Sequence, residues 1–190
     1  MLRVVEYLVF LYNTADFSKV ADFSKGGYPT SNLRIGIGHD THRLGPGQVL
    51  RLGGVDVPHD RSLIGHSDAD VLLHALIDAL LGAVALGDIG QIFPNTEEKN
   101  ADRDSVEMLQ EVMSQIDGLG YRIVNIDCTV FAERPQLAPH TLEIRNRLCG
   151  ILSVAAEAVS LKAKTGESVG PIGNEQAISA QAVALLEKVS

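Results

Sequence analysis

The sequence predicts an α+β fold, in which a single mixed β-sheet carries helices packed on one face. Two observations lead to this fold class. Runs of alternating apolar residues, typical of strands, are interspersed with runs of helical periodicity, and an early hairpin precedes the helices. The chain has 190 residues, of which 45% are apolar and 21% charged, the composition of an ordinary globular domain. We therefore expect one folded domain over residues 33–190.

The first elements are strands. Apolar residues alternate over Leu33–Gly38, which predicts the first strand. Val49–Leu52 and Val55–Val57 flank the pair Gly53-Gly54. Two short apolar runs around two glycines indicate a tight hairpin, because glycine adopts the turn conformations that such hairpins need.

Helices and strands then alternate. Helical spacing predicts helices over Ser67–Leu86 and Ser105–Leu119. Ser67 is the expected N-cap of the first helix, with Asp70 three residues later as an acidic variant of the capping box. The later elements are a strand over Tyr121–Phe131, a helix over Pro139–Val154, a strand over Val159–Ala163 and a last helix over Ile178–Val189. Helices on one face leave the other face of the sheet open, so we expect another subunit to cover it.

Composition excludes several classes of partner. The formal net charge is −8, and no cluster of Lys and Arg occurs, so no nucleic-acid partner is expected. No apolar run reaches the ~20 residues that span a bilayer, so no membrane partner is expected. Two cysteines in a chain of this length do not make a disulfide framework, which favours a reducing, cytoplasmic location.

Residues 1–32 differ from the rest of the chain. Ala15–Lys19 is repeated as Ala21–Lys25, and the segment has the composition of neither a secretory signal nor a transit peptide. We expect this segment to be a poorly ordered N-terminal extension.

Three residues form a candidate metal site. Asp40 and His42 lie two apart in an extended segment, so their side chains face the same side. His74, on the following helix, adds a second imidazole. Two nitrogens and one oxygen favour zinc, with iron(II) as a substitute, and three protein ligands leave an open catalytic position. Spacing alone leaves two alternatives open: His74 as a hydrogen-bonded core residue, and Asp40 with His42 as part of a turn.

Three later loops carry polar groups suited to an anionic ligand. Residues 86–96 include Asp88 and two glycines, and residues 132–139 contain two prolines that stiffen a loop. Lys164, Thr165 and nearby amides offer groups for a phosphate, and Glu167 offers one for a divalent cation. Gly170–Gly173 leads into the last expected helix, which is weak evidence for an anion site.

The order of these motifs resembles one enzyme family. The motifs are Asp40-Thr41-His42, His66 to Asp70 with His74, Leu86 to Gly90 with Phe93-Pro94, Arg134-Pro135, and Lys162 to Glu167. In this order they resemble the 2-C-methyl-D-erythritol 2,4-cyclodiphosphate synthases, and the resemblance covers residues 33–190. It implies that the protein acts in the non-mevalonate route to isoprenoid precursors. The reaction would convert 4-diphosphocytidyl-2-C-methyl-D-erythritol 2-phosphate into the cyclic diphosphate and CMP.

The resemblance also implies an assembly and a set of site residues. It implies a homotrimer about a three-fold axis, with active sites between neighbouring subunits. Zn²⁺ would bind Asp40, His42 and His74, and Mg²⁺ or Mn²⁺ would bind Glu167. His66 and Thr165 match catalytic positions thought to stabilise the transition state. The implied substrate-binding residues are Asp40, Thr41, His42, His66, Ser67, Asp88, Ile89, Gly90, Phe93, Pro94, Asn95, Thr96, Glu97, Ala132, Pro135, Gln136, Leu137, Ala138, Lys164, Thr165, Gly166 and Glu167.

Four positions depart from the pattern of the family. Asn95 stands where the family usually has Asp, and Gln136 where it has Lys, which removes a charge at each position. Asn174 and Gln181 replace an Arg and a Glu that pair at the trimer axis, where the family binds an anionic isoprenoid.

Two other functions remain as alternatives. A zinc-dependent phosphoesterase would release inorganic phosphate instead of CMP. A catalytically inactive trimer would bind metal and metabolites without turnover.

Overall fold

The structure is a computed structural model that describes residues 31–94, 96–97, 100 and 102–189. The chain from Asn32 onward forms one compact unit. The extension expected over residues 1–32 lies almost entirely outside the described residues. Among the residues that are described, no helix is long and apolar enough to cross a membrane.

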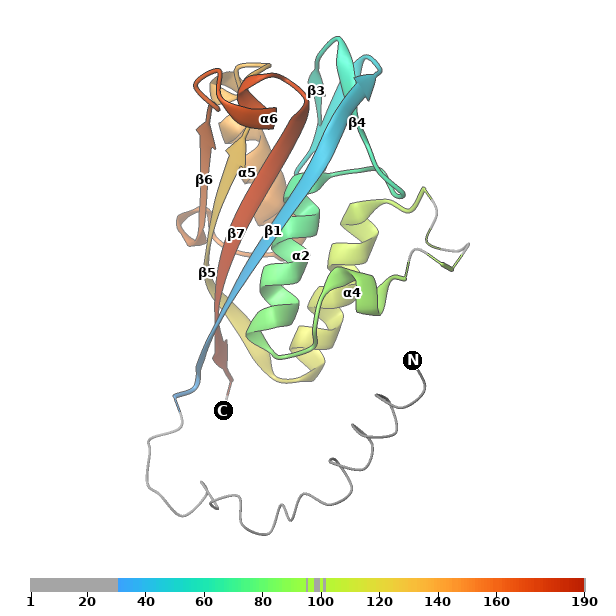
Figure 1. Cartoon of the computed structure of the whole chain (residues 1–190). Coiled ribbons are helices and arrows are strands. Elements are labelled where there is room, and N and C mark those ends of the chain that lie inside the picture. Colours follow the sequence, from blue (N-terminus) through green and yellow to red (C-terminus); the bar gives the residue numbers. More distant parts are fainter. Residues whose placement is uncertain (1–30, 95, 98–99, 101, 190) are drawn as a thin grey trace, which may run out of the picture. The chain divides into compact units, whose positions relative to one another are not determined.

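One five-stranded sheet forms the framework of this unit (Figure 1). Its strands are β1 (Leu33–Pro46), β4 (Arg61–Ile64), β5 (Tyr121–Phe131), β6 (Val159–Lys164) and β7 (Ala177–Lys188). Their order across the sheet is β4-β1-β7-β5-β6. Only β5 and β6 run parallel, and the other neighbouring pairs are antiparallel. The sheet is therefore mixed, as the sequence predicts.

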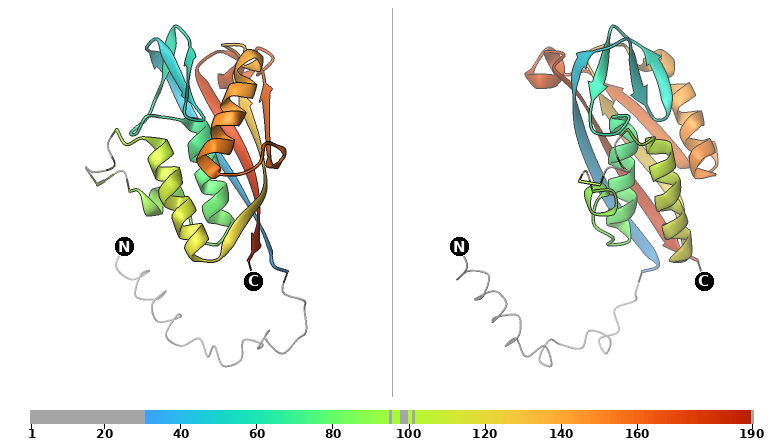
Figure 2. Two further views of the ribbon diagram at one scale, coloured as in Figure 1. Left: turned by 180° about the vertical axis from the view of Figure 1, so that it is seen from behind. Right: turned by 90° about the vertical axis from the view of Figure 1, so that its right-hand side faces the viewer.

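The helices gather on one face of this sheet, as Figure 2 shows from two further sides. The three longest are α2 (Val71–Ala83), α4 (Ser105–Gly118) and α5 (Thr141–Leu152). The predicted hairpin is present as β2 (Val49–Leu52) and β3 (Val55–Pro58), which form a small second sheet. The short helices are α3 (Ile89–Ile92) and α6 (Gly170–Gly173), with single 3-10 turns at Ala138–His140 and Ala156–Ala158. The α+β class with helices on one face is thus confirmed.

The last element is a strand, and the prediction of a helix over Ile178–Val189 is wrong. β7 is the central strand and pairs with β1 on one side and β5 on the other. Ala180, Ala182 and Ala184 are fully buried on the side of the helices, and Gln181 between them is exposed. Alanine favours helices when its surroundings do not decide, but two ladders of backbone hydrogen bonds override that preference here. The glycine-rich segment 170–173 therefore does not lead into a long helix.

Helix α2 begins later than the sequence predicts, because Asp70 rather than Ser67 is its N-cap. The Asp70 carboxylate accepts hydrogen bonds from two amides of the first helical turn, at 3.0 and 3.2 Å. It also accepts from the amides of Gly53 (2.9 Å) and Gly54 (2.7 Å) in the hairpin. One buried carboxylate thus caps α2 and also attaches the hairpin to it. The attachment to the hairpin is a contact that no local capping pattern predicts. The helix also ends earlier than expected, at Ala83 rather than Leu86.

Strand β1 and helix α2 are in direct backbone contact. A Cβ atom added at Gly38 would lie 1.9 Å from the carbonyl oxygen of Ala75, and one at Gly36 would lie 1.9 Å from that of Ala79. Only glycine leaves room for the helix at these two positions. The contact sets His74 of α2 beside the middle of β1.

The opposite face of the sheet is open in the single chain, as predicted. Ile35 and Ile37 on β1 are 72% and 64% exposed. Their neighbours across the antiparallel ladder are Leu185 and Val183 on β7. These four residues form a contiguous apolar patch on a face that carries no helix.

Candidate active site

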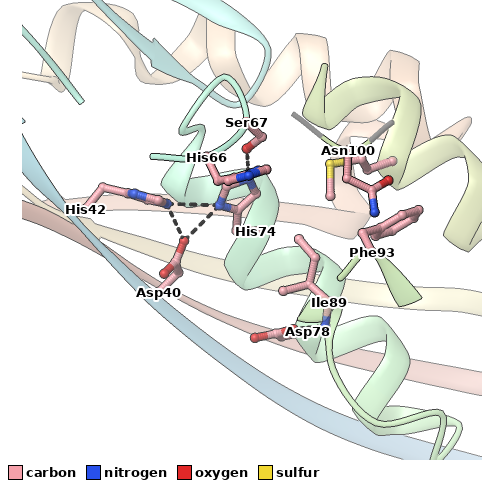
Figure 3. A pocket seen from close by; sticks show the side chains of 10 residues that line it. Asp40, His42, His66, Ser67, His74, Asp78, Ile89, Phe93 and Asn100 are labelled. Atoms are coloured by element: carbon pink, nitrogen blue, oxygen red, sulfur yellow. Dashed lines mark hydrogen bonds and ion pairs between the residues drawn. The ribbon is translucent and has the colours of Figure 1, made fainter. Parts of the chain in front are cut away.

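Asp40, His42 and His74 meet at one point between β1 and α2 (Figure 3). Asp40 and His42 lie on the helix-facing side of β1, and His74 lies in the first turn of α2. The Asp40 Oδ2 atom is 2.9 Å from His42 Nε2 and 2.9 Å from His74 Nδ1, and the two nitrogens are 3.1 Å apart. Asp40 and His42 lie within a strand, so the alternative of a turn is wrong, whereas His74 is buried and hydrogen-bonded, as the alternative of a core histidine expects.

The hydrogen bond of His42 Nδ1 determines whether Nε2 carries a proton or a lone pair. His42 Nδ1 lies 2.9 Å from the carbonyl oxygen of Ile64 on β4. A carbonyl only accepts, so Nδ1 carries the proton in the neutral ring. The lone pair of Nε2 therefore points toward Asp40 and His74.

The same reasoning applies to His74. His74 Nε2 lies 2.9 Å from Ser105 Oγ and 3.1 Å from Ser67 Oγ. Ser105 donates its own hydroxyl proton to Asp68, so it accepts from His74 and places the ring proton on Nε2. The lone pair of Nδ1 then faces Asp40 and His42.

The three facing atoms fit a bound cation. Two imidazole lone pairs and a carboxylate oxygen within 3.1 Å of one another repel unless a positive charge lies between them. Ligands about 2.0–2.1 Å from a tetrahedral metal lie roughly 3.3 Å apart, close to the separations seen here.

A cavity of about 190 Å³ opens beside these three side chains. Besides these three it is lined by His66, Ser67, Asp78, Ile89, Phe93, Asn100 and Met108. The Asp78 carboxylate accepts a hydrogen bond from the backbone amide of Ile89 at 2.8 Å. Asp88 caps the short helix α3 that begins at Ile89, by accepting from the amide of Gln91 at 3.0 Å. Asp78 therefore positions the 88–93 segment, a role that the sequence analysis missed. Its position one helical turn after His74 could have indicated that it faces the same site.

A second cavity, of about 260 Å³, lies where β5 and β6 end. It is lined by Ala132, Glu133, Pro135, Gln136, Leu137, Ala138, Ala163, Lys164 and Thr165. The two predicted loops after these strands are thus brought together. The Glu133 carboxylate links them by accepting from the amide of Gly166 at 3.0 Å, another contact that the sequence analysis missed. Beside this cavity, Thr165 Oγ1 donates to Glu167 Oε1 at 2.7 Å.

Some predicted site residues line neither cavity. Thr41 alternates with Asp40 and His42 along β1 and so faces the open side of the sheet. Seven more predicted residues are not among those that line either cavity: Asp88, Gly90, Pro94, Thr96, Glu97, Gly166 and Glu167. Asn95 lies outside the described residues. Of the other departures, Asn174 ends α6, and Gln181 faces the open side of β7 between His39 and Thr129.

The two cavities lie in different parts of the sheet. Asp40 pairs with Ala180, Ala180 with Val130, and Val130 with Ala163, so one row across the sheet joins the two regions. Three strand spacings separate the ends of this row, about 14 Å. A single chain therefore presents the predicted residues as two separate groups.

The chain matches known proteins over this whole unit. The family model described as YgbB family matches residues 33–187. A 2-C-methyl-D-erythritol 2,4-cyclodiphosphate synthase of Syntrophomonas wolfei is 50% identical over 156 residues, which are 82% of this chain and 99% of that protein. The enzyme of the same name from Salinibacter ruber is 52% identical over 155 residues, 82% of this chain and 99% of that protein.

A solved structure agrees with the fold. It is of a 2C-methyl-D-erythritol-2,4-cyclodiphosphate synthase in its CDP-bound form, and it matches with a TM-score of 0.75 and 34% identity. The match covers 81% of this chain and all of that one. The resemblance that the motifs suggested is confirmed: the chain belongs to the YgbB family, that of the 2-C-methyl-D-erythritol 2,4-cyclodiphosphate synthases.

Proposed function

We propose that the protein converts 4-diphosphocytidyl-2-C-methyl-D-erythritol 2-phosphate into 2-C-methyl-D-erythritol 2,4-cyclodiphosphate and CMP. The 2-phosphate of the substrate attacks the β-phosphate, and CMP leaves. The observation that carries the proposal is the convergence of Asp40, His42 and His74 on one point at the side of a cavity. The attacking phosphate is already anionic, so the site needs to hold and align phosphates rather than to generate a nucleophile.

The metal half of the site, which we define as Asp40, His42, His74 and the cavity beside them, would hold Zn²⁺. Bound there, the ion would act as a Lewis acid on a phosphate oxygen. Ser67 Oγ accepts from the amide of Ala69 (3.4 Å) and faces His74 Nε2, so its own proton is free to donate to a phosphate. His66 lines the same cavity and is proposed to stabilise the charge that develops in the transition state.

The nucleotide half, which we define as the loops 132–138 and 163–167, would hold the CDP group. The cavity between these loops has the size for a pyrimidine, and the related structure with CDP bound supports this assignment. Thr165 donates to Glu167 and so orients its exposed carboxylate, which is proposed to bind Mg²⁺ or Mn²⁺ beside the phosphates.

The two halves are proposed to meet only in an assembly. About 14 Å of sheet separates them in one chain, whereas the reaction requires the 2-phosphate to contact the β-phosphate of the CDP group. The apolar patch of Ile35, Ile37, Val183 and Leu185 offers a surface for neighbouring copies. We propose a homotrimer in which the metal half of one subunit faces the nucleotide half of the next.

Incubation with the diphosphocytidyl substrate, followed by phosphorus NMR, tests the proposal. The expected products are CMP and a cyclic diphosphate, with no inorganic phosphate. Release of inorganic phosphate would favour the zinc-dependent phosphoesterase instead. Binding of metal and CDP without any product would favour the inactive trimer.

A further inference from the structure

A chain of hydrogen bonds behind His74 extends from the metal ligands into the protein. His74 Nε2 lies 2.9 Å from Ser105 Oγ, and Ser105 Oγ donates to Asp68 Oδ1. The second oxygen of Asp68 accepts from the backbone amide of Ser105 at 3.0 Å. Ser105 is fully buried, and His74 is only 8% exposed. A carboxylate, a hydroxyl and an imidazole are thus linked in series, away from solvent for most of their length.

The direction of each bond follows from which groups can donate. A carboxylate only accepts, so the single proton of the Ser105 hydroxyl is committed to Asp68. Ser105 Oγ can then only accept from His74 Nε2. A hydroxyl that donates to a carboxylate accepts a hydrogen bond more strongly than a hydroxyl that does not. An imidazole ring whose N–H makes a strong hydrogen bond is in turn a better electron donor at its other nitrogen.

We propose that Asp68 is a positioning residue that acts through Ser105 on His74, fixing its tautomer and strengthening its bond to the metal. The inference rests on the proposed function in one respect, that the triad holds a metal ion. It goes beyond that function because neither Asp68 nor Ser105 belongs to the triad or lines the cavity.

The two histidine ligands differ in this respect. His42 Nδ1 donates to the backbone carbonyl of Ile64, a neutral acceptor. His74 instead reaches a negative charge through one hydroxyl. The negative charge of Asp68 also favours a cation at the triad. His74 is therefore the ligand whose donor strength the protein adjusts through side chains.

Asp68 also has structural contacts, which a test must separate from this role. Its amide donates to the carbonyl of Arg103 at 3.3 Å, and Oδ1 accepts from the amide of Asp70 at 3.2 Å. These bonds join the segment before α2 to the segment before α4. Loss of activity in an Asp68 variant would therefore not distinguish the two roles, whereas metal affinity and a metal spectrum do.

The experiment compares Co²⁺ binding to the full chain and to its variants by competition with a chelator. Ser105→Ala removes the hydroxyl, and Asp68→Asn removes the charge while keeping the size. Each is expected to lower Co²⁺ affinity by about 10–100-fold and to shift the visible d–d bands. Asp104→Asn is the matched control, since Asp104 caps the same end of α4 by accepting from the amide of Val106 at 2.7 Å without touching Ser105 Oγ. It should change the unfolding midpoint little, because Asn caps a helix about as well as Asp, and it should leave the affinity and the bands unchanged.

The possible results distinguish a failure of this inference from a failure of the proposed function. If the unmodified protein binds no Co²⁺ or Zn²⁺, the metal site of the proposed function fails. If it binds Co²⁺, and Ser105→Ala and Asp68→Asn match it in affinity and spectrum, only the inference fails. A larger loss in Ser67→Ala than in Ser105→Ala would also overturn it, because the more distant hydroxyl would then be the acceptor. Should Ser105→Ala not fold, Asp68→Asn decides alone.

Discussion

The side chains of the metal half and those of the nucleotide half are held in place to different degrees within one chain. In the metal half, the ligand atoms of Asp40, His42 and His74 already lie within 3.1 Å of one another, and the far nitrogen of each ring is held. In the nucleotide half, Thr165 and Glu167 are exposed and are held mainly by each other. A strand and a helix in backbone contact fix the first half, whereas two loops form the second. The comparison shows that one chain holds the side chains of the proposed metal half more firmly than those of the proposed nucleotide half.

Residues with left-handed backbone lie close in sequence to both halves, but in different surroundings. Ala69, just before α2, has a φ of 56° and is buried. Glu167 and Ser168, beside the nucleotide cavity, have φ angles of 50° and 60° and are exposed. Such residues persist only where the surroundings hold them. Packing holds Ala69, and the hydrogen bond from Gly166 to Glu133 holds the loop that contains the other two.

The largest expected effect is the loss of metal on substitution of His74, which distinguishes a proposed metal ligand from a residue that only lines the cavity. His74→Ala should abolish metal binding and turnover, because two remaining ligands bind a metal by orders of magnitude more weakly. His66→Ala is the matched variant in the same cavity, and it should keep the metal while losing turnover. Elemental analysis of both purified proteins checks the difference. Stoichiometric zinc in His74→Ala would show that the ligand set is wrong.

The next prediction tests whether the halves belong to different subunits. His74→Ala disables only the metal half and Glu167→Ala only the nucleotide half, so each alone should be nearly inactive. In a ring of identical interfaces refolded from an equal mixture, about one interface in four pairs two intact halves. Activity should therefore recover to roughly a quarter of the wild-type value. No recovery, with mixed trimers confirmed by native mass spectrometry, would place each site within one subunit.

A third prediction tests the rigid contact under the metal half. Gly38→Ala would place a Cβ 1.9 Å from the carbonyl oxygen of Ala75, so β1 and α2 must separate. We expect a loss of about 3 kcal/mol in the free energy of unfolding, the cost of overpacking a tight contact, together with weaker metal binding. Gly118→Ala, where a Cβ meets nothing within 4 Å, should be neutral or stabilising. Equal urea midpoints for the two variants would contradict this account of the contact.

The smallest expected effect concerns the nucleotide half. Gln136 lines its cavity, and Gln136→Lys adds an ammonium group there. CDP binding should tighten by about 1 kcal/mol, and less at high salt. Gln110→Lys adds the same charge on the exposed side of α4 and should leave CDP binding unchanged. Calorimetry at two salt concentrations checks both, and an unchanged affinity in Gln136→Lys would show that this loop does not approach the nucleotide.

The sequence by itself determined the elements and ligands that depend on local pattern. The hairpin around Gly53-Gly54, the strand Tyr121–Phe131 and the helix from Ser105 all follow from periodicity and turn chemistry, which act over a few residues. Asp40 and His42 share a face for the same reason, since an extended chain repeats every two residues. The order of the motifs then identified the family without any structure.

Only the tertiary structure decided what depends on distant partners. Ile178–Val189 has the composition of a helix, yet β1 and β5 on either side make it a strand. Asp70 caps α2 because the hairpin supplies two more amides to the same carboxylate. The bonds from His74 through Ser105 to Asp68 join segments 31 and 37 residues apart. The gap between the metal and nucleotide halves is likewise set by strand order across the sheet. Pairing and burial act between residues far apart along the chain, so no local pattern encodes them.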